Sequence, residues 1–179
     1  FTEQALFTQD DLTGLDLRLA PSIPDVFRQV VAGEADLGFA AIENSIEGSV
    51  NATQDTLAFE VELLIQREVV ISIELNLMVA PGTSLTDLER VCSYPHAIAQ
   101  CRGWLAEHLP DVAIEATNST ADAARQLAVT PDGRTAAIAP GRAATAYGLD
   151  VLAADIEDHP ENQTRFVLVA ADGIPAPTG

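Results

Sequence analysis

Short apolar runs alternate with helix-like segments through the second half of the chain, and this alternation constrains the fold more than any other feature. The strand-like runs, which have the length and composition of buried strands, are residues 91–94, 112–116, 136–139 and 151–153. The helices predicted between them cover residues 95–108, 121–129 and 141–148. Strands that alternate with helices in this way favour an α/β unit built on a parallel sheet.

The first half of the chain predicts a second unit of the same class. Residues 15–19 alternate like a strand, Ser22 begins a helix that Gly33 ends, and residues 37–42 form an apolar strand. These segments make one βαβ unit, and we expect its two strands to pair in parallel.

Further elements flank this βαβ unit. The chain opens in a helix over residues 1–7, with Thr2 as its predicted cap. Another helix follows residue 51 and runs to about Phe59, and residues 61–79 predict two strands.

The charged residues exclude several functions. The chain of 179 residues has 27 acidic side chains and nine cations, all of them Arg, for a net charge of −18. This charge argues against a nucleic-acid partner and against an anionic membrane surface. The absence of Lys excludes Schiff-base and pyridoxal chemistry and a Walker-type phosphate loop. Chemistry must therefore come from hydroxyls, amides, carboxylates, Arg and backbone dipoles.

Other classes of site and location are also disfavoured. The two cysteines and three histidines have neither a disulfide framework nor metal-ligand spacing, so we expect no metal. No apolar run approaches the roughly 20 residues of a membrane span, and no leader resembles a signal peptide. A reduced, cytoplasmic setting is the expectation.

Polar clusters stand where predicted strands give way to helices, at residues 43–51, 93–96 and 118–120. Helix N-termini offer free N–H groups and about half a positive charge, which suits a small anion. Each cluster by itself fits an ordinary loop with a helix cap better than a binding site. The three clusters together with Thr164 and Arg165 predict a cleft that binds a small anion.

A fourth polar stretch, residues 161–166, leads into the apolar run of residues 167–170. A buried strand holds its first residues rigidly, as catalytic geometry requires. Because side chains alternate along a strand, Thr164 and Phe166 point to one face and Arg165 to the other. A capped strand without a catalytic role is the alternative interpretation of this stretch.

These polar stretches resemble conserved blocks of the prephenate dehydratase catalytic domain. Residues 41–50 (AIENSIEGSV) resemble the block IENS-x-x-G-x-V, and residues 93–101 (SYPHAIAQC) resemble S-x-P-x-x-x-x-Q-C. Residues 119–124 (STADAA) are similar to the block ST/N-x-x-AA, and residues 162–166 (NQTRF) resemble the terminal T-R-F block. The blocks occur in family order across nearly the whole chain, and together they are specific.

The resemblance implies a fold, a reaction and an assembly. The fold would be α/β with two lobes, like type II periplasmic binding proteins, and the active site would lie in the cleft. One lobe would comprise residues 1–75 and 160–170, the other residues 76–159, and residues 171–179 would be a linker or tail. The reaction would convert prephenate to phenylpyruvate, CO2 and water without a cofactor. The protein would be a homodimer or homotetramer.

The same resemblance assigns residues. Thr164 would be catalytic, acting on the departing hydroxyl group. The side chains expected to bind substrate are Thr2, Asn44, Ser45, Ser93, Gln100, Ser119, Thr120 and Arg165. Arg165 suits a carboxylate by charge. Alternation puts it opposite Thr164, however, so an ion pair with Glu43 or Glu47 is an equal alternative.

The chain also departs from the family pattern. Only Phe1-Thr2 remains of the Gly-rich turn that borders the family site, so we expect sequence upstream. A histidine that the family often carries aligns with Leu75. No segment corresponds to the phenylalanine-binding ACT domain, so we expect that phenylalanine does not regulate this chain. The rival functions are arogenate dehydratase and a non-catalytic two-lobed module that binds an organic anion.

Overall fold

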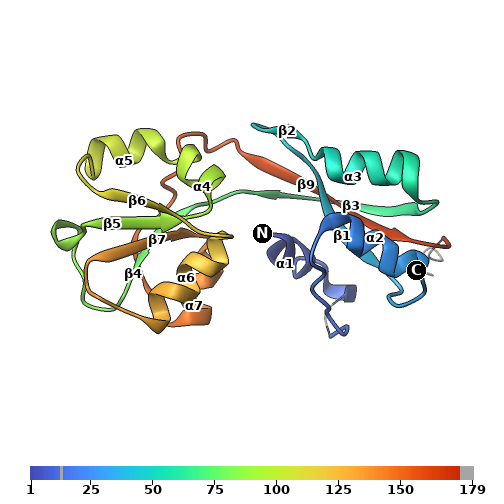
Figure 1. Cartoon of the computed structure of the whole chain (residues 1–179), viewed down its shortest axis with the longest axis horizontal. Coiled ribbons are helices and arrows are strands. Elements are labelled where there is room, and N and C mark those ends of the chain that lie inside the picture. Colours follow the sequence, from blue (N-terminus) through green and yellow to red (C-terminus); the bar gives the residue numbers. More distant parts are fainter. Residues whose placement is uncertain (13, 174–179) are drawn as a thin grey trace. The chain divides into compact units, whose positions relative to one another are not determined.

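A computed structural model describes residues 1–12 and 14–173 of the chain (Figure 1). The predicted tail segment 174–177 lies outside the described residues. Contacts divide the chain into two compact units, Phe1–Ser72 with the chain from Glu161 onward, and Ile73–Pro160. The lobe boundaries expected from the sequence, after residues 75 and 159, stay a prediction.

The first unit is built on a four-stranded sheet in the order β2-β1-β9-β3, and every pair of neighbours is antiparallel. Its strands are β1 (Gly38–Asn44), β2 (Gly48–Ser49), β3 (Leu64–Ser72) and β9 (Gln163–Ala170). Its helices are α1 (Thr2–Leu6), α2 (Ile23–Val31) and α3 (Asn51–Asp55), with 3-10 turn Asp10–Leu12 and π-helical turn Thr56–Glu60. Strand β9 therefore has a partner on both sides, which makes its position in the sheet well determined.

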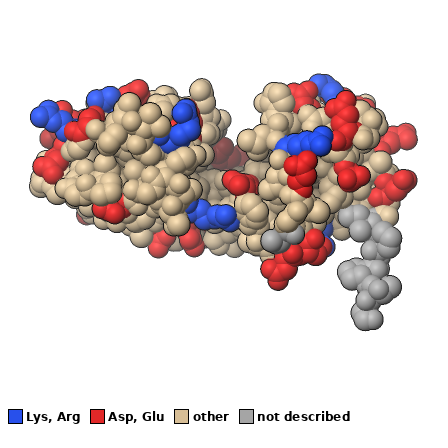
Figure 2. Space-filling model, turned by 90° about the horizontal axis from the view of Figure 1, so that it is seen from below, with Lys and Arg blue, Asp and Glu red and all other residues tan. Residues whose placement is uncertain are grey.

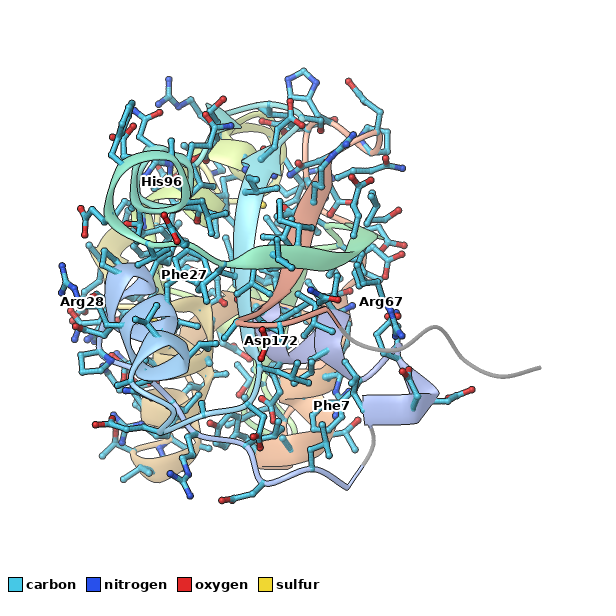
Figure 3. The ribbon with its side chains drawn as sticks, turned by 90° about the vertical axis from the view of Figure 1, so that its right-hand side faces the viewer. Phe7, Phe27, Arg28, Arg67, His96 and Asp172 are labelled. Atoms are coloured by element: carbon cyan, nitrogen blue, oxygen red, sulfur yellow. The ribbon has the colours of Figure 1, made fainter. Side chains whose placement is uncertain are left out.

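Both faces of this sheet are covered. Val167 and Val169 of β9 pack with Phe27 of α2 in one apolar cluster. The opposite face carries Phe166, whose ring stacks on Phe39 with centroids 5.4 Å apart. Figure 3 shows α1 and α2 on opposite sides of the sheet. Alternate residues of β9 thus serve separate cores, which explains why the strand is apolar from Phe166 onward.

The predicted parallel βαβ unit is wrong. The helix is correct, because α2 is capped by the Ser22 hydroxyl, which accepts a hydrogen bond from the Asp25 N–H. Residues 15–19, however, form no strand, and strand β1 pairs antiparallel with β9 and β2. Alternation alone does not stabilise a strand, which also needs a neighbour for its backbone hydrogen bonds. Leu15, Leu17 and Leu19 are accordingly 50, 45 and 98% exposed.

The second unit confirms the predicted alternation of strands and helices. Its sheet has the order β6-β5-β7-β4-β8. The strands are β4 (Asn76–Val79), β5 (Arg90–Ser93), β6 (Ala113–Ala116), β7 (Thr135–Ala139) and β8 (Asp150–Ala153). The helices are α4 (Pro95–Gln100), α5 (Arg102–His108), α6 (Thr120–Val129) and α7 (Gly141–Tyr147), with 3-10 turn Leu85–Asp87. Strands β6, β5 and β7 are parallel, whereas β4 is antiparallel to β7 and β8, so the sheet is mixed.

The helix predicted over residues 95–108 is instead two helices, interrupted at Cys101. The Asp158 carboxylate accepts hydrogen bonds from the backbone N–H groups of Gly103 and Trp104, at 2.8 and 3.0 Å. It thereby satisfies the free donors at the start of α5. A Cβ at Gly103 would lie 2.8 Å from the Asp158 carboxylate, so a larger residue there would require the carboxylate to shift. The partner that causes the break is distant in sequence.

Both cysteines, Cys92 and Cys101, are free and buried. Burial raises the pKa of the Cys92 thiol to about 11, and it also raises the pKa of Cys101. Neither thiol is therefore a nucleophile at neutral pH. Within the described ranges 1–12 and 14–173, the structure contains no helix with the length and apolar character needed to cross a membrane.

Candidate active site

The end of β1 and the start of β9 bring Asn44 and Thr164 together in the first unit. The two residues are direct cross-strand partners in the antiparallel ladder. The Asn44 Nδ2 donates hydrogen bonds to Thr164 Oγ1 at 2.8 Å and to Asn162 Oδ1 at 2.9 Å. Asn162 is fully buried, and Asn44 is half-buried. The predicted catalytic residue thus sits in a pre-formed polar cluster, which we call the Asn44 cluster (Asn44, Asn162, Thr164).

The orientation of the Asn44 amide is fixed by its partners. Its Oδ1 accepts hydrogen bonds from the backbone N–H groups of Ile46 and Glu47, at 3.0 and 3.1 Å. Backbone N–H groups are only donors, so the oxygen must face the loop and the NH2 group must face β9. Both amide hydrogens and both carbonyl lone pairs are then used.

This orientation determines what the Thr164 hydroxyl can do. An amide NH2 only donates, so Thr164 Oγ1 must accept from Asn44. Within the ranges 1–12 and 14–173, this is the one hydrogen bond that the Thr164 side chain makes. The hydroxyl proton therefore remains available for a group that lies outside the Asn44 cluster.

Ser45 also connects the end of β1 to the start of β9, beside the Asn44 cluster. Its Oγ accepts a hydrogen bond from the Gln163 N–H at 2.9 Å, and its own N–H donates to the Gln163 carbonyl at 2.9 Å. Both contacts act on the backbone, so Ser45 holds the start of β9 in register with the end of β1.

In the second unit, Ser93, Ser119 and Thr120 lie at one edge of the sheet. Strands β5 and β6 are parallel, and Ser93 is paired with Ala116, so the polar residues that follow these strands are neighbours. The Ser93 hydroxyl donates to the Ile138 carbonyl at 2.6 Å and is fully buried. Ser119 caps α6 by accepting from the Asp122 N–H at 3.0 Å. Ser93 and Ser119 both stabilise the fold here, in addition to any contact with a ligand.

Gln100 and Thr2 are placed differently. Gln100 ends α4, and its backbone carbonyl accepts a hydrogen bond from the Asp158 N–H at 2.7 Å. Thr2 is the first residue of α1, but the N-cap is Phe1 and makes no side-chain capping bond. The prediction that Thr2 caps this helix is therefore wrong.

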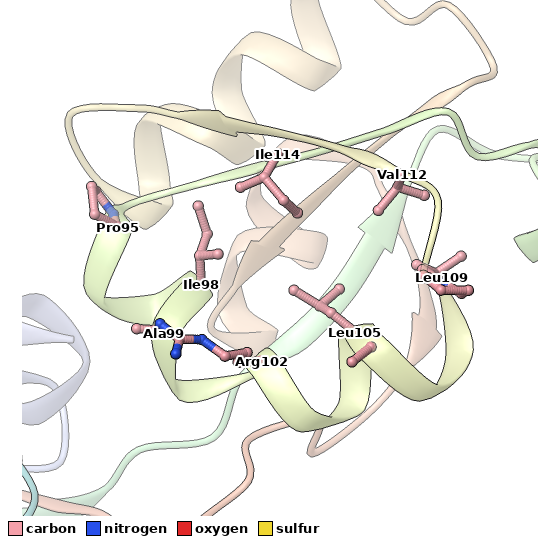
Figure 4. Close-up of a pocket in the computed structure, with 10 residues that line it drawn as sticks. Pro95, Ile98, Ala99, Arg102, Leu105, Leu109, Val112 and Ile114 are labelled. Carbon is pink, nitrogen blue, oxygen red and sulfur yellow. The ribbon is translucent and has the colours of Figure 1, made fainter.

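Each unit has a groove on its surface. In the second unit, an apolar groove of about 330 Å³ lies between α4, α5 and β6, lined by side chains such as Ile98, Leu105 and Ile114 (Figure 4). In the first unit, a larger groove of about 540 Å³ runs beside residues 15–20 and Phe39. Neither groove is lined by Asn44 or Thr164, so the polar cluster stands apart from both.

The sequence matches the family described as prephenate dehydratase over residues 1–173. The chain belongs to the prephenate dehydratase family.

The matched region covers most of this chain but only part of each curated relative. The prephenate dehydratase of Mycolicibacterium gilvum is 44% identical over 155 residues, which cover 86% of this chain and 49% of the relative. That of Bacillus subtilis is 39% identical over 153 residues, which cover 84% of this chain and 54% of the relative. The chain thus spans about half the length of these curated relatives.

Solved structures show the same fold. The prephenate dehydratase of Arthrobacter aurescens, solved in complex with L-Phe, superposes with a TM-score of 0.87 at 41% identity, covering 99% of this chain and 58% of that one. A protein named GqqA, described as a quorum quenching acylase, superposes with a TM-score of 0.79 at 27% identity, covering 98% of this chain and 62% of that one. The predicted α/β fold with two sheets is confirmed.

Arg165 lies beside the Asn44 cluster, but its guanidinium is held by acids of the protein. It contacts the Glu43 carboxylate at 3.3 Å and the Glu68 carboxylate at 2.9 Å. Glu43 is its cross-strand partner, on the face away from Thr164. This geometry favours the ion-pair alternative over a contact with substrate.

We expect Arg165→Gln to change KM for prephenate by no more than about threefold, because the guanidinium is paired with Glu43 and Glu68. The free energy of unfolding should fall by less than about 1 kcal/mol, because exposed ion pairs contribute little to stability. Steady-state kinetics and urea denaturation check this. A KM that rises tenfold or more would show that Arg165 binds the substrate.

The sequence motif that contains Thr164 also contains Asn162, but it assigns no role to Asn162. The signal that was present is the spacing: residues 162 and 164 lie on the same face of an extended segment, so a neighbouring side chain can contact both. Only the register of β1 against β9 shows that Asn44 is that side chain.

Proposed function

We propose that this chain catalyses the prephenate dehydratase reaction, the conversion of prephenate to phenylpyruvate, CO2 and water, without a cofactor. The observation that carries the proposal is the Thr164 hydroxyl, which accepts from Asn44 and retains its own proton. Family membership supplies the substrate class.

The chemistry requires help for a poor leaving group. The bond between the ring and its carboxylate breaks, and the electron pair moves into the ring as CO2 departs. The opposite C–O bond breaks at the same time, and the departing oxygen takes up a proton from the solvent and leaves as water. Thr164 donates a hydrogen bond to that oxygen as negative charge develops, an interaction that is stronger in the transition state than in the ground state. The formation of an aromatic ring provides the driving force.

Substrate contacts elsewhere in the chain are part of the proposal. In the first unit these are Thr2, Ser45 and Asn44. The Asn44 contact would be one of packing, because its hydrogen-bonding groups are all used within the protein. In the second unit they are Ser93, Gln100, Ser119 and Thr120. The Ser93 hydroxyl would accept a hydrogen bond, because its proton is donated to the Ile138 carbonyl, and Ser119 is the N-cap of α6. Amides, hydroxyls and helix dipoles would hold the dianion, since the structure pairs Arg165 with acids of the protein.

This mode of binding predicts an unusual salt response. Acidic side chains outnumber Arg on the protein surface, as Figure 2 shows for one face, and they repel a dianion. Salt screens this repulsion, whereas fixed dipoles in a partly buried site are screened weakly. We expect KM for prephenate to stay constant or fall between low and moderate ionic strength. A steep rise in KM across the same range would indicate binding by exposed cations.

The alternatives are distinguished by substrate. An arogenate dehydratase would show the higher kcat/KM for arogenate, and the proposal expects it for prephenate. A non-catalytic anion-binding module would bind prephenate, as measured by calorimetry, without forming phenylpyruvate. The likeness to GqqA favours an acylase as a further candidate, which would hydrolyse an acylated amine. Assays of all three activities on one preparation separate these functions.

We also propose that the protein is cytoplasmic and forms a homodimer or homotetramer, as the family resemblance implies. Sedimentation velocity across a range of concentrations tests the assembly, and a monomer at every concentration would overturn it.

A further inference from the structure

We infer that Asn162 is a positioning residue for the proposed reaction, acting through Asn44 on the orientation of the Thr164 hydroxyl. The inference rests on the proposed function, and it adds a residue to which the sequence motif assigned no role. Asn162 itself does not need to contact the substrate.

The first argument is the division of the Asn44 NH2 group between two acceptors. One N–H goes to Thr164 Oγ1 at 2.8 Å and the other to Asn162 Oδ1 at 2.9 Å. The contacts from Ile46 and Glu47 decide which end of the amide is oxygen. Asn162 then fixes the rotation of the amide, because a planar NH2 group can meet both acceptors in only a narrow range of angles.

The second argument is burial. Asn162 is 0% exposed, so in the intact protein its carbonyl, and not water, accepts the second Asn44 N–H. Without that carbonyl, the Asn44 amide loses a hydrogen bond in a partly buried place and turns to recover one. Turning moves the other N–H out of line with Thr164 Oγ1. The Thr164 hydroxyl then rotates more freely, and fewer molecules present its proton to the leaving group.

The test compares Asn162→Ala with Asn162→Asp, which keeps an acceptor oxygen. We expect Asn162→Ala to lower kcat by about 10- to 100-fold with KM little changed, because it misdirects one catalytic group. Asn162→Asp should recover most of that loss. In the Thr164→Ala background, Asn162→Ala should lower kcat no further, since a residue that acts only through Thr164 has nothing left to position. Equal losses in both backgrounds would show a merely structural role and overturn the inference.

A second measurement does not depend on activity. In protein labelled with 15N-asparagine, the Asn44 side-chain protons, assigned from the Asn44→Asp spectrum, should exchange slowly with solvent. We expect Asn162→Ala to speed this exchange about tenfold or more, because a local hydrogen bond is lost. Unchanged exchange would overturn the inference. Slow exchange in a folded wild-type chain that makes no phenylpyruvate would instead refute the proposed function and leave the Asn162 contact intact.

Discussion

Thr164→Ala is expected to lower kcat for prephenate by about 10²–10⁴-fold, the usual contribution of a positioned proton donor. This corresponds to roughly 3–5 kcal/mol of barrier. KM should change little, because the lost interaction strengthens only as the C–O bond breaks. The free energy of unfolding should also change little, because the hydroxyl makes a single hydrogen bond to the half-buried Asn44.

Thr164→Ser is the matched control, since it keeps the hydroxyl and loses only the methyl group that restricts its rotamer. It should retain much more activity than the alanine variant. If Thr164→Ala keeps kcat within a few fold and raises KM instead, Thr164 binds substrate and does not assist the leaving group.

Asn44→Asp should also abolish most turnover, although it changes a single group and barely alters the size of the side chain. The oxygen that accepts from Ile46 and Glu47 is retained, but the NH2 group becomes a second acceptor. Thr164 would then donate its proton to residue 44, so the proton is diverted from the leaving group. We expect kcat to fall by about 10²-fold, comparable to the loss of a transition-state donor.

Gln54→Glu is the control for charge, because it makes the same amide-to-carboxylate change on the exposed surface of α3. It should leave kcat within about twofold, as surface changes usually do. An Asn44→Asp variant with nearly normal kcat would mean that the Asn44 contact does not determine the direction of the Thr164 proton.

The second unit could be predicted from the sequence because its structure follows local rules. Most strands there are short apolar runs, Pro95 begins α4 as predicted, and α6 begins one residue before its predicted start. The break between α4 and α5 could not be predicted, because it depends on Asp158, which is more than 50 residues away from the N–H groups that it accepts from. Long-range hydrogen bonds of this kind leave no periodic signal in the sequence.

The first unit shows the opposite case. Residues 15–19 have a strand pattern and no strand partner, and β1 pairs with β9 from the far end of the chain. A sequence pattern marks a segment that can form a strand, but it does not show which strand will pair with it. The predicted parallel pairing of residues 15–19 with residues 37–42 is wrong for this reason. For the site, the motifs identified Thr164 and Asn44 separately. Their contact, and the place of Asn162, follow only from the antiparallel register.

The most direct measurement of the central claim is the release of CO2 and phenylpyruvate when the purified chain is given prephenate. We expect the wild type to release the two products saturably and in equal amounts, and Thr164→Ala to release them much more slowly. A folded wild-type chain that binds prephenate and releases neither product, or that releases both no faster than Thr164→Ala, would refute the proposed reaction.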